Sequence, residues 1–249
     1  ADFDTEKMDP VQIREWLGNG YGEEGMQACR FDAARSIEET RETLLPMLHW
    51  FRHNYPYYHQ ACFQCGNSTT VRVGNTRSSA EEREHISGIC PRYNCRTEVV
   101  YCEHCNSFSR FARYSSLAKI LEVGKGRCGE YSTTFYHLMR SLGYQTRWVV
   151  DWTDHVWVEV QVQGEWMHID PCEAAFNDKR MYIGWGKKHT YVMAFSYDGL
   201  EDVTAEYADD MAEVAKRRDL TQEDVTKALT EAQAEWISNY SKALNYTYV

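Results

Sequence analysis

One stretch of the sequence decides the fold, Gly126-Arg127-Cys128-Gly129-Glu130-Tyr131-Ser132. It places Cys128 between the glycine-rich turn at 124–127 and a segment with helical periodicity that runs to Leu142. The sulfur therefore lies at or near the start of a helix, where unpaired backbone N–H groups and the positive end of the helix dipole favour a thiolate. The stretch predicts that Cys128 is a nucleophile.

A histidine and an aspartate follow in the order that nucleophilic catalysis requires. His155 lies in a predicted strand at 155–162, and Asp170 lies in a predicted strand at 165–170. A tight glycine-containing turn joins the two strands, so the hairpin brings His155 and Asp170 alongside each other. A base beside a thiol, oriented by a carboxylate, is the arrangement that activates such a nucleophile. His168 is the alternative base, because in a regular strand it shares the face of Asp170.

The bare pattern also has an interpretation without catalysis. A cysteine before a helix is more often an apolar residue of the core, and a histidine–aspartate pair on adjacent strands is often coincidental. The chain has nine histidines, so chance pairs are frequent. Spacing alone therefore leaves both interpretations open.

The composition limits the class of protein. With 249 residues, 43% hydrophobic and 14% aromatic, the chain can fold as one globular domain, or as one with a small satellite. A formal net charge of -10 and the lack of a basic block argue against a nucleic-acid partner. No apolar run reaches the length of a membrane span. The acidic beginning, Ala1–Asp4, lacks the apolar core of a signal peptide.

Cysteine usage predicts a metal site and a reducing compartment. The chain has nine cysteines, an odd number, and two CxxC pairs suit thiolate ligands better than a disulfide framework. We therefore expect a cytoplasmic protein with one structural Zn²⁺, since four thiolates leave the ion no open position. Cys90 and Cys95 have a less usual spacing and are interpreted as ordinary reduced cysteines. The expected ligands are Cys62, Cys65, Cys102 and Cys105.

Periodicity and turn signals divide the chain into segments. Helices are expected at 10–17, 31–54 (with Pro46 as a kink or break), 115–123, 128–142 and 221–244. Strands are expected at 145–152, 155–162, 165–170, 190–196 and 200–204. The domain organisation expected is N-terminal helices at 1–54, a zinc module at 55–112, a catalytic core at 113–207 and C-terminal helices at 208–249.

Five ordered motifs resemble one known family. They are Gly-Arg-Cys-Gly-Glu at 126–130, Asp-His-Val-Trp-Val-Glu at 154–159, Asp-Pro-Cys-Glu at 170–173, Ile-Gly-Trp-Gly-Lys-Lys at 183–188 and Tyr-Val-Met-Ala-Phe-Ser at 191–196. Together they resemble the cytosolic peptide:N-glycanases of the transglutaminase-like superfamily, from about Cys62 to Tyr207. The chain departs from the family at Tyr131 and Val150, where tryptophan is usual.

The resemblance implies an α+β fold: a transglutaminase-like, papain-like cysteine hydrolase core with an antiparallel sheet, flanking helices and a small four-cysteine zinc module. It implies that Cys128, His155 and Asp170 form a catalytic triad. Trp157 and Glu159 share the strand face of His155, and the resemblance implies that both bind substrate. From the residues alone they read equally well as a core tryptophan and a solvated acid.

The function implied is hydrolysis of the amide that joins an asparagine side chain to N-acetylglucosamine, without an organic cofactor. The substrates would be misfolded N-glycoproteins degraded in the cytoplasm. The apolar stripe of the C-terminal helix, from Val225 to Leu244, could bind a ubiquitin-receptor shuttle factor of the proteasome. The same triad would also serve a transglutaminase or a cysteine protease. A non-catalytic scaffold that binds glycans or proteasome-linked proteins is the third interpretation.

Overall fold

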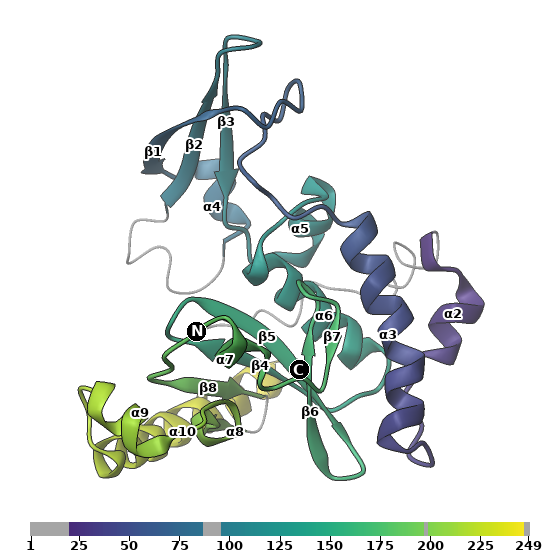
Figure 1. Ribbon diagram of the computed structural model, residues 1–249, viewed down its shortest axis with the longest axis vertical. Coiled ribbons are helices and arrows are strands. Elements are labelled where there is room, and N and C mark those ends of the chain that lie inside the picture. Colours follow the sequence, from purple (N-terminus) through teal and green to yellow (C-terminus); the bar gives the residue numbers. More distant parts are fainter. Residues whose placement is uncertain (1–19, 87–95, 197–198, 247–249) are drawn as a thin grey trace.

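The computed structural model describes residues 20–86, 96–196 and 199–246 (Figure 1), with side chains up to residue 235. The helix expected at 10–17, Cys90 and Cys95, and the side chains at the end of the C-terminal stripe lie outside the described part. The structure has a six-stranded antiparallel sheet with helices around it and a separate three-stranded sheet. It therefore has the α+β architecture expected.

The six-stranded sheet has the order β7-β6-β5-β4-β8-β9. The strands are β4 (Thr146–Asp151), β5 (His155–Val162), β6 (Glu165–Asp170), β7 (Ala175–Phe176), β8 (Val192–Phe195) and β9 (Leu200–Asp202). The bounds of β5 and β6 agree with those predicted. Their turn has Gln163 at φ 52° and Gly164 at φ 83°, and two positive φ values match the twist of a tight hairpin. β9 is shorter than expected, because Thr204 donates to Asp202 Oδ1 and begins a helix.

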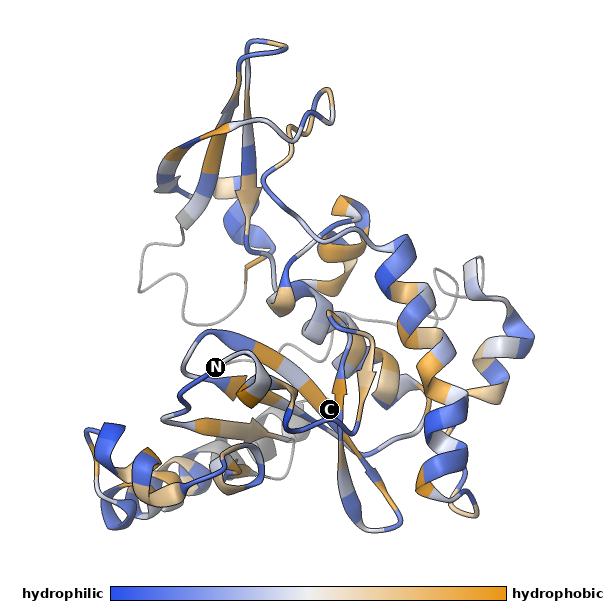
Figure 2. Ribbon diagram, in the orientation of Figure 1, coloured by the Kyte–Doolittle hydropathy of each residue, from blue (hydrophilic) through white to orange (hydrophobic). Residues whose placement is uncertain are grey.

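Helices cover one face of this sheet. α6 (Cys128–Ser141) packs on β4 and β5, with α3 (Ile37–Asn54), α5 (Leu117–Val123) and α2 (Glu23–Ala28) beyond it (Figure 1). Polar and apolar residues alternate around α3 (Figure 2), and its apolar positions join the main core. α3 begins later than expected because Ser36 caps it, and it continues through Pro46. The buried side chains of this core include Leu44, Leu48, Phe51, Phe135, Leu138, Val158 and Val160.

A second, smaller core lies on the opposite face of β5. Alternation along the strand puts Trp157 in this core and Val158 in the main one. α7 (Met181–Gly184) and α8 (Thr204–Tyr207) provide Tyr182 and Tyr207, which pack on Trp157. α9 (Met211–Arg217) and α10 (Gln222–Tyr246) follow, and Gln233 of α10 accepts the backbone N–H of Leu200 at 2.7 Å. Among the described helices, none is long and apolar enough to cross a membrane.

The three-stranded sheet projects from the rest of the molecule (Figure 1). It consists of β1 (Val71–Arg77), β2 (Arg96–Cys102) and β3 (Ser107–Ala112), with α4 (Ala80–Glu84) beside it. The sequence did not predict these strands, because side chains on both faces of β1 are largely exposed and show no hydrophobic alternation. Between α3 and this sheet, the chain passes the turn before α6, where Tyr58 N–H donates to Gly126 O at 2.8 Å.

Candidate active site and metal centre

Cys128 is the first residue of α6, and its side chain is partly buried. Glu130 fixes the start of the helix, because its Oε2 accepts the backbone N–H of Arg127 at 2.9 Å. Its other oxygen accepts Arg113 Nε at 2.8 Å. Gly126 is required here by space, since a Cβ at this position would lie 2.4 Å from Cβ of Glu130. The sequence therefore places the thiol at a helix N-terminus, as expected.

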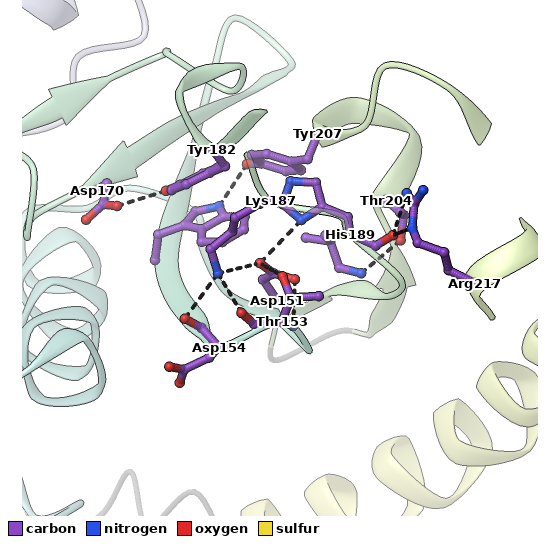
Figure 3. Close-up of polar contacts among 12 residues, drawn as sticks. Asp151, Thr153, Asp154, Asp170, Tyr182, Lys187, His189, Thr204, Tyr207 and Arg217 are labelled. Atoms are coloured by element: carbon purple, nitrogen blue, oxygen red, sulfur yellow. Dashed lines mark hydrogen bonds and ion pairs between the residues drawn. The ribbon is translucent and has the colours of Figure 1, made fainter. Parts of the chain in front are cut away.

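The structure brings His155 and Asp170 together across the β5–β6 hairpin. His155 Nε2 lies 2.7 Å from Asp170 Oδ2. Asp170 is fully buried, and its other oxygen accepts the backbone N–H of Cys172 at 2.8 Å. Tyr182 also donates its hydroxyl to Asp170 Oδ2 at 2.9 Å (Figure 3). Three donors therefore hold the carboxylate, and the carboxylate in turn fixes the imidazole.

The electrostatics of the site favour a charged imidazole. Burial lowers the pKa of His155, but the hydrogen bonds and negative charges of Asp170 and Cys128 outweigh it and raise that pKa to about 9. Burial alone would raise the pKa of Asp170, yet the hydrogen bond and charge of His155 hold it below the ordinary value. Asp170 and Cys128 thus act together on His155 and hold its imidazole in the charged form at neutral pH.

His168 does not take the place of His155. It is fully buried, its Nε2 lies 2.6 Å from the hydroxyl of Tyr182, and burial lowers its pKa to about 4. A neutral imidazole in this position supports Tyr182. The alternative base considered from the sequence is therefore part of the scaffold beneath Asp170.

Trp157 and Glu159 lie on the same strand face as His155, but both side chains have 0% exposure. Trp157 stacks on Tyr182 with ring centroids 4.4 Å apart and donates Nε1–H to Tyr207 at 2.9 Å. Glu159 binds the buried guanidinium of Arg147 and accepts the hydroxyl of Tyr207. The substrate-binding role predicted for these two residues is not consistent with these positions, because α7 and α8 cover the strand face that carries them.

Two aromatic residues that sequence reasoning missed border the site. Trp185 is 48% exposed, and its ring centroid lies 5.6 Å from that of His155. Tyr57 is 37% exposed. Burial raises its pKa to about 12, against the opposing effect of a hydrogen bond with the backbone of Cys128. The motif at 183–188 was a signal for Trp185, whereas Tyr57 precedes every quoted motif and is placed by its parallel bridge to Gly126.

Two residues depart from the family pattern, Tyr131 in α6 and Val150 in β4, and both lie in structural positions. The ring of Tyr131 is buried, stands edge-on to Phe51 at 5.1 Å, and its hydroxyl donates to the carbonyl of Tyr55. Val150 lies in β4, paired with Val156 and Met193. Tyr131 therefore fills the core below the start of α6.

The four cysteines of the two CxxC pairs form a cluster. Cys62 Sγ lies 3.5 Å from Cys105 Sγ, Cys65 Sγ lies 3.6 Å from Cys102 Sγ, and all four sulfurs lie within 4.8 Å of one another. One pair lies in the loop before β1, and the other lies at the end of β2 and in the β2–β3 turn. A tetrahedron of thiolates about 2.3 Å from a zinc ion has similar separations between its sulfurs. The donor set and its spacing fit a zinc site.

Comparison with known proteins identifies the relatives. Residues 93–171 match the family model of the transglutaminase-like superfamily. The chain is 38% identical over 200 residues to a chicken protein named peptide-N(4)-(N-acetyl-beta-glucosaminyl)asparagine amidase, which covers 77% of this chain and 29% of the relative. Proteins of the same name from rice (39% identical; 67% of this chain, 36% of the relative) and Yarrowia lipolytica (40%; 66% and 46%) also match. The chain therefore spans less than half the length of these relatives.

Solved structures support the fold. Two crystal structures of Rad4–Rad23, one bound to a 6-4 photoproduct UV lesion and one crosslinked to undamaged DNA, each match with a TM-score of 0.54 at 15% identity. The first match covers 92% of this chain and 52% of the other. At this identity the likeness concerns the fold alone. The matched family model and the named relatives together carry the conclusion that this chain has a transglutaminase-like core and is related to the peptide-N(4)-(N-acetyl-beta-glucosaminyl)asparagine amidases.

Proposed function

We propose that the chain is a cysteine amidase that hydrolyses the bond between an asparagine side chain and N-acetylglucosamine in N-glycoproteins. The observation that carries this proposal is the pairing of His155 with the buried Asp170, 2.7 Å apart, in electrostatic contact with Cys128 at the start of α6. The relatives supply the choice of bond, since all those named above carry the amidase name. Cys128, His155 and Asp170 are the proposed triad.

The first half of the reaction would be acyl transfer to sulfur. The Cys128 thiolate attacks the side-chain carbonyl carbon, and the carbonyl π electrons move to oxygen. Backbone N–H groups at the start of α6, with the hydroxyl of Tyr57 beside them, lie where they could stabilise that oxyanion. The His155 imidazolium then gives its proton to the departing nitrogen, so that the C–N bond breaks and a glycosylamine leaves a thioester behind.

The second half would be hydrolysis. His155, now neutral, takes a proton from water as the water oxygen attacks the thioester carbonyl. The C–S bond breaks, the thiolate returns, and asparagine has become aspartate. Asp170 keeps the imidazole in one orientation because Nε2 faces the carboxylate, which leaves Nδ1 for the thiol. No organic cofactor enters these steps.

Substrate recognition is proposed to involve the exposed aromatic surface rather than Trp157 and Glu159. Trp185 stands edge-on to His155 and has nearly half its surface accessible, so a sugar ring can stack on it. Trp157 and Glu159 instead hold β5 in place from beneath. Exchange of Trp185 for alanine would then raise KM for glycopeptides more than it lowers kcat.

The zinc ion would have a structural role. Four thiolates close its coordination, and it would tie the loop before β1 to the β2–β3 turn. The segments 1–54, 55–112, 113–207 and 208–249 are the proposed units of the chain. We further propose misfolded glycoproteins in the cytoplasm as substrates, and a ubiquitin-receptor shuttle factor as a partner of α10, following the resemblance.

The test is incubation of a denatured N-glycoprotein with the protein and a reductant, followed by mass spectrometry, with Cys128→Ala in parallel. The proposal predicts loss of the whole glycan and conversion of asparagine to aspartate with the intact cysteine only. Incorporation of a primary amine into glutamine would favour a transglutaminase, and cleavage of the backbone would favour a protease. An unchanged glycoprotein would favour a binding scaffold.

A further inference from the structure

The turn that precedes His155 is clamped by a lysine from another part of the chain. β4 ends at Asp151 and β5 begins at His155, and these two residues pair across the strands. Between them Asp154 has φ 75°, a left-handed conformation that residues other than glycine adopt infrequently. A turn of this kind persists when surrounding contacts hold it.

The buried carboxylate of Asp151 organises the inside of the turn. Its Oδ1 accepts the backbone N–H of Thr153 at 2.9 Å, and its Oδ2 accepts the Thr153 hydroxyl at 2.6 Å. His189 Nδ1 lies 3.3 Å from the same Oδ2 (Figure 3). Burial raises the pKa of Asp151, but these partners and Lys187 together hold it well below its ordinary value. The carboxylate is therefore charged at neutral pH.

Lys187 completes the clamp. Its Nζ donates to Asp151 Oδ2 at 3.0 Å, to the carbonyl of Thr153 at 2.7 Å and to the carbonyl of Asp154 at 3.1 Å. Figure 3 shows the ammonium group at the meeting point of these three bonds. An ammonium has three donors, so all three are used on one turn. Lys187 therefore has no donor left for a substrate.

The segment that carries Lys187 also contacts Asp170 and His155 itself. Tyr182, in α7, donates to Asp170, and the ring of Trp185 lies against that of His155. The backbone N–H of Lys187 donates to Tyr182 O at 3.1 Å, which closes the segment into a compact unit. One short piece of chain thus fixes the carboxylate, borders the imidazole and holds the turn before it.

We propose that Lys187 is a positioning residue: by binding the 151–154 turn, it fixes the His155 imidazole relative to Cys128 and Asp170. This inference rests on the proposed function for the reaction concerned, but the geometry it claims is measurable without any glycan. A displacement of about 1 Å at a reacting group can cost about 100-fold in rate. Removal of the ammonium should therefore weaken the Cys128–His155 pair while the fold persists.

The test is the pH dependence of Cys128 alkylation by iodoacetamide, followed by peptide mapping, in the full chain. The variant is Lys187→Met, which keeps most of the length of the side chain and removes its charge and its donors. The matched control is Lys188→Met, since Lys188 is the exposed neighbour in sequence. We expect Lys187→Met to lower the alkylation rate at pH 7 at least about tenfold, by analogy with misplaced catalytic groups, and to shift the pH profile of that rate. Lys188→Met should behave as the unaltered protein does.

A Lys187→Met protein that is folded by near-ultraviolet circular dichroism and alkylates like the unaltered protein would overturn the inference. If that variant does not fold, Thr153→Val removes one bond of the same turn, and it should shift the profile in the same direction to a smaller extent; no shift would overturn the inference. With a glycopeptide, kcat should fall and KM stay constant. If the unaltered protein leaves the glycopeptide intact, the proposed function fails while the alkylation comparison still decides the role of Lys187.

Discussion

Arg127 forms a two-bond ion pair with Glu98, from Nη1 to Oε1 at 2.7 Å and from the second Nη to Oε2 at 2.8 Å. Arg127 immediately precedes Cys128, and Glu98 lies in β2 of the three-stranded sheet. The guanidinium also lies over the ring of Phe111 at 5.4 Å. The three-stranded sheet, beside which the four cysteines cluster, is therefore tied directly to the residue before the nucleophile.

Exchange of Glu98 for glutamine should reduce activity through this connection. The change removes one charge of a largely buried pair, and loss of one partner of such a pair costs about 3 kcal/mol. We expect a fall in kcat of about tenfold, because the start of α6 becomes less well held. The measurement is glycopeptide kinetics together with thermal unfolding.

The control for this prediction is Glu82→Gln. Glu82 of α4 pairs with Arg110 of β3 at 2.7 Å, beside the same sheet, and the Arg110 side chain is 41% exposed against 21% for Arg127. Pairs of this exposure contribute about 1 kcal/mol or less. Equal kinetic losses in the two variants would contradict the proposed link between Glu98 and Cys128.

Removal of the zinc ion should also lower the reactivity of Cys128, through the three-stranded sheet. A chelator should release about one zinc ion per chain, as expected for a single four-thiolate site. The β1–β3 sheet has few buried apolar side chains, so we expect it to lose its fixed structure and to release Glu98 from Arg127. Cys128 alkylation should then slow, and added zinc should restore it. Full alkylation and activity after metal loss, verified by atomic absorption, would contradict this account.

Two buried tyrosines make it possible to distinguish an effect on the triad from an effect on the stability of the fold. Tyr182 donates to Asp170, whereas Tyr207 donates to Glu159 in the same buried cluster. A hydrogen bond to a charged group contributes about 1.5–3 kcal/mol. Both Tyr182→Phe and Tyr207→Phe should therefore lose stability, but only Tyr182→Phe should lose about tenfold or more in kcat. Similar kcat values for the two variants would count against a role of Tyr182 at Asp170.

The sequence predicted the parts of the fold that local signals determine. The β5–β6 hairpin was placed correctly because its turn requires positive φ at Gln163 and Gly164 and its strands alternate. The hairpin in turn placed His155 beside Asp170. By contrast, β1 is largely exposed on both faces and has little hydrophobic alternation, and the three-stranded sheet was not predicted. Its four cysteines were found through their spacing instead.

What covers a strand face could not be predicted from the strand itself. Alternation correctly put His155, Trp157 and Glu159 on one face, but the covering residues Tyr182 and Tyr207 come from α7 and α8, distant in sequence. The buried pairing of Glu159 with Arg147 depends on the β4–β5 register. Long-range packing of this kind leaves no periodic signal, so the residues that cover this strand face could not be predicted from the strand.

Exchange of Glu159 for glutamine tests whether this residue stabilises the fold or binds substrate. The change removes the fully buried carboxylate partner of Arg147 and leaves that guanidinium with Glu201 and Glu206, which are more exposed. Loss of one partner of a buried ion pair costs about 3 kcal/mol. We expect a large loss of stability to urea unfolding, with KM for a glycopeptide unchanged at a temperature where the variant is folded. A raised KM with undiminished stability would instead support direct binding of substrate by Glu159.

The pH dependence follows from the raised pKa of His155. Since that pKa is about 9 in the folded chain, against an ordinary value of 6.5, the charged imidazole stabilises the fold fully below pH 6.5, and this contribution is lost between pH 6.5 and 9. In Asp170→Asn the main favourable partner is neutral, and burial then lowers the pKa of His155. We expect nuclear magnetic resonance to show the imidazole neutral at pH 7 in that variant. Asp178→Asn, at an exposed site, should leave the titration unchanged; an unaltered titration in Asp170→Asn would contradict this assignment.

The most direct test of the proposed amidase activity is hydrolysis of a glycopeptide with one N-glycan in water enriched in heavy oxygen. The account predicts that the former asparagine becomes aspartate with one heavy oxygen in its side-chain carboxylate, that the intact glycan is released, and that Cys128→Ala abolishes both. Asparagine that retains N-acetylglucosamine, or a peptide cleaved in its backbone, would contradict the central claim.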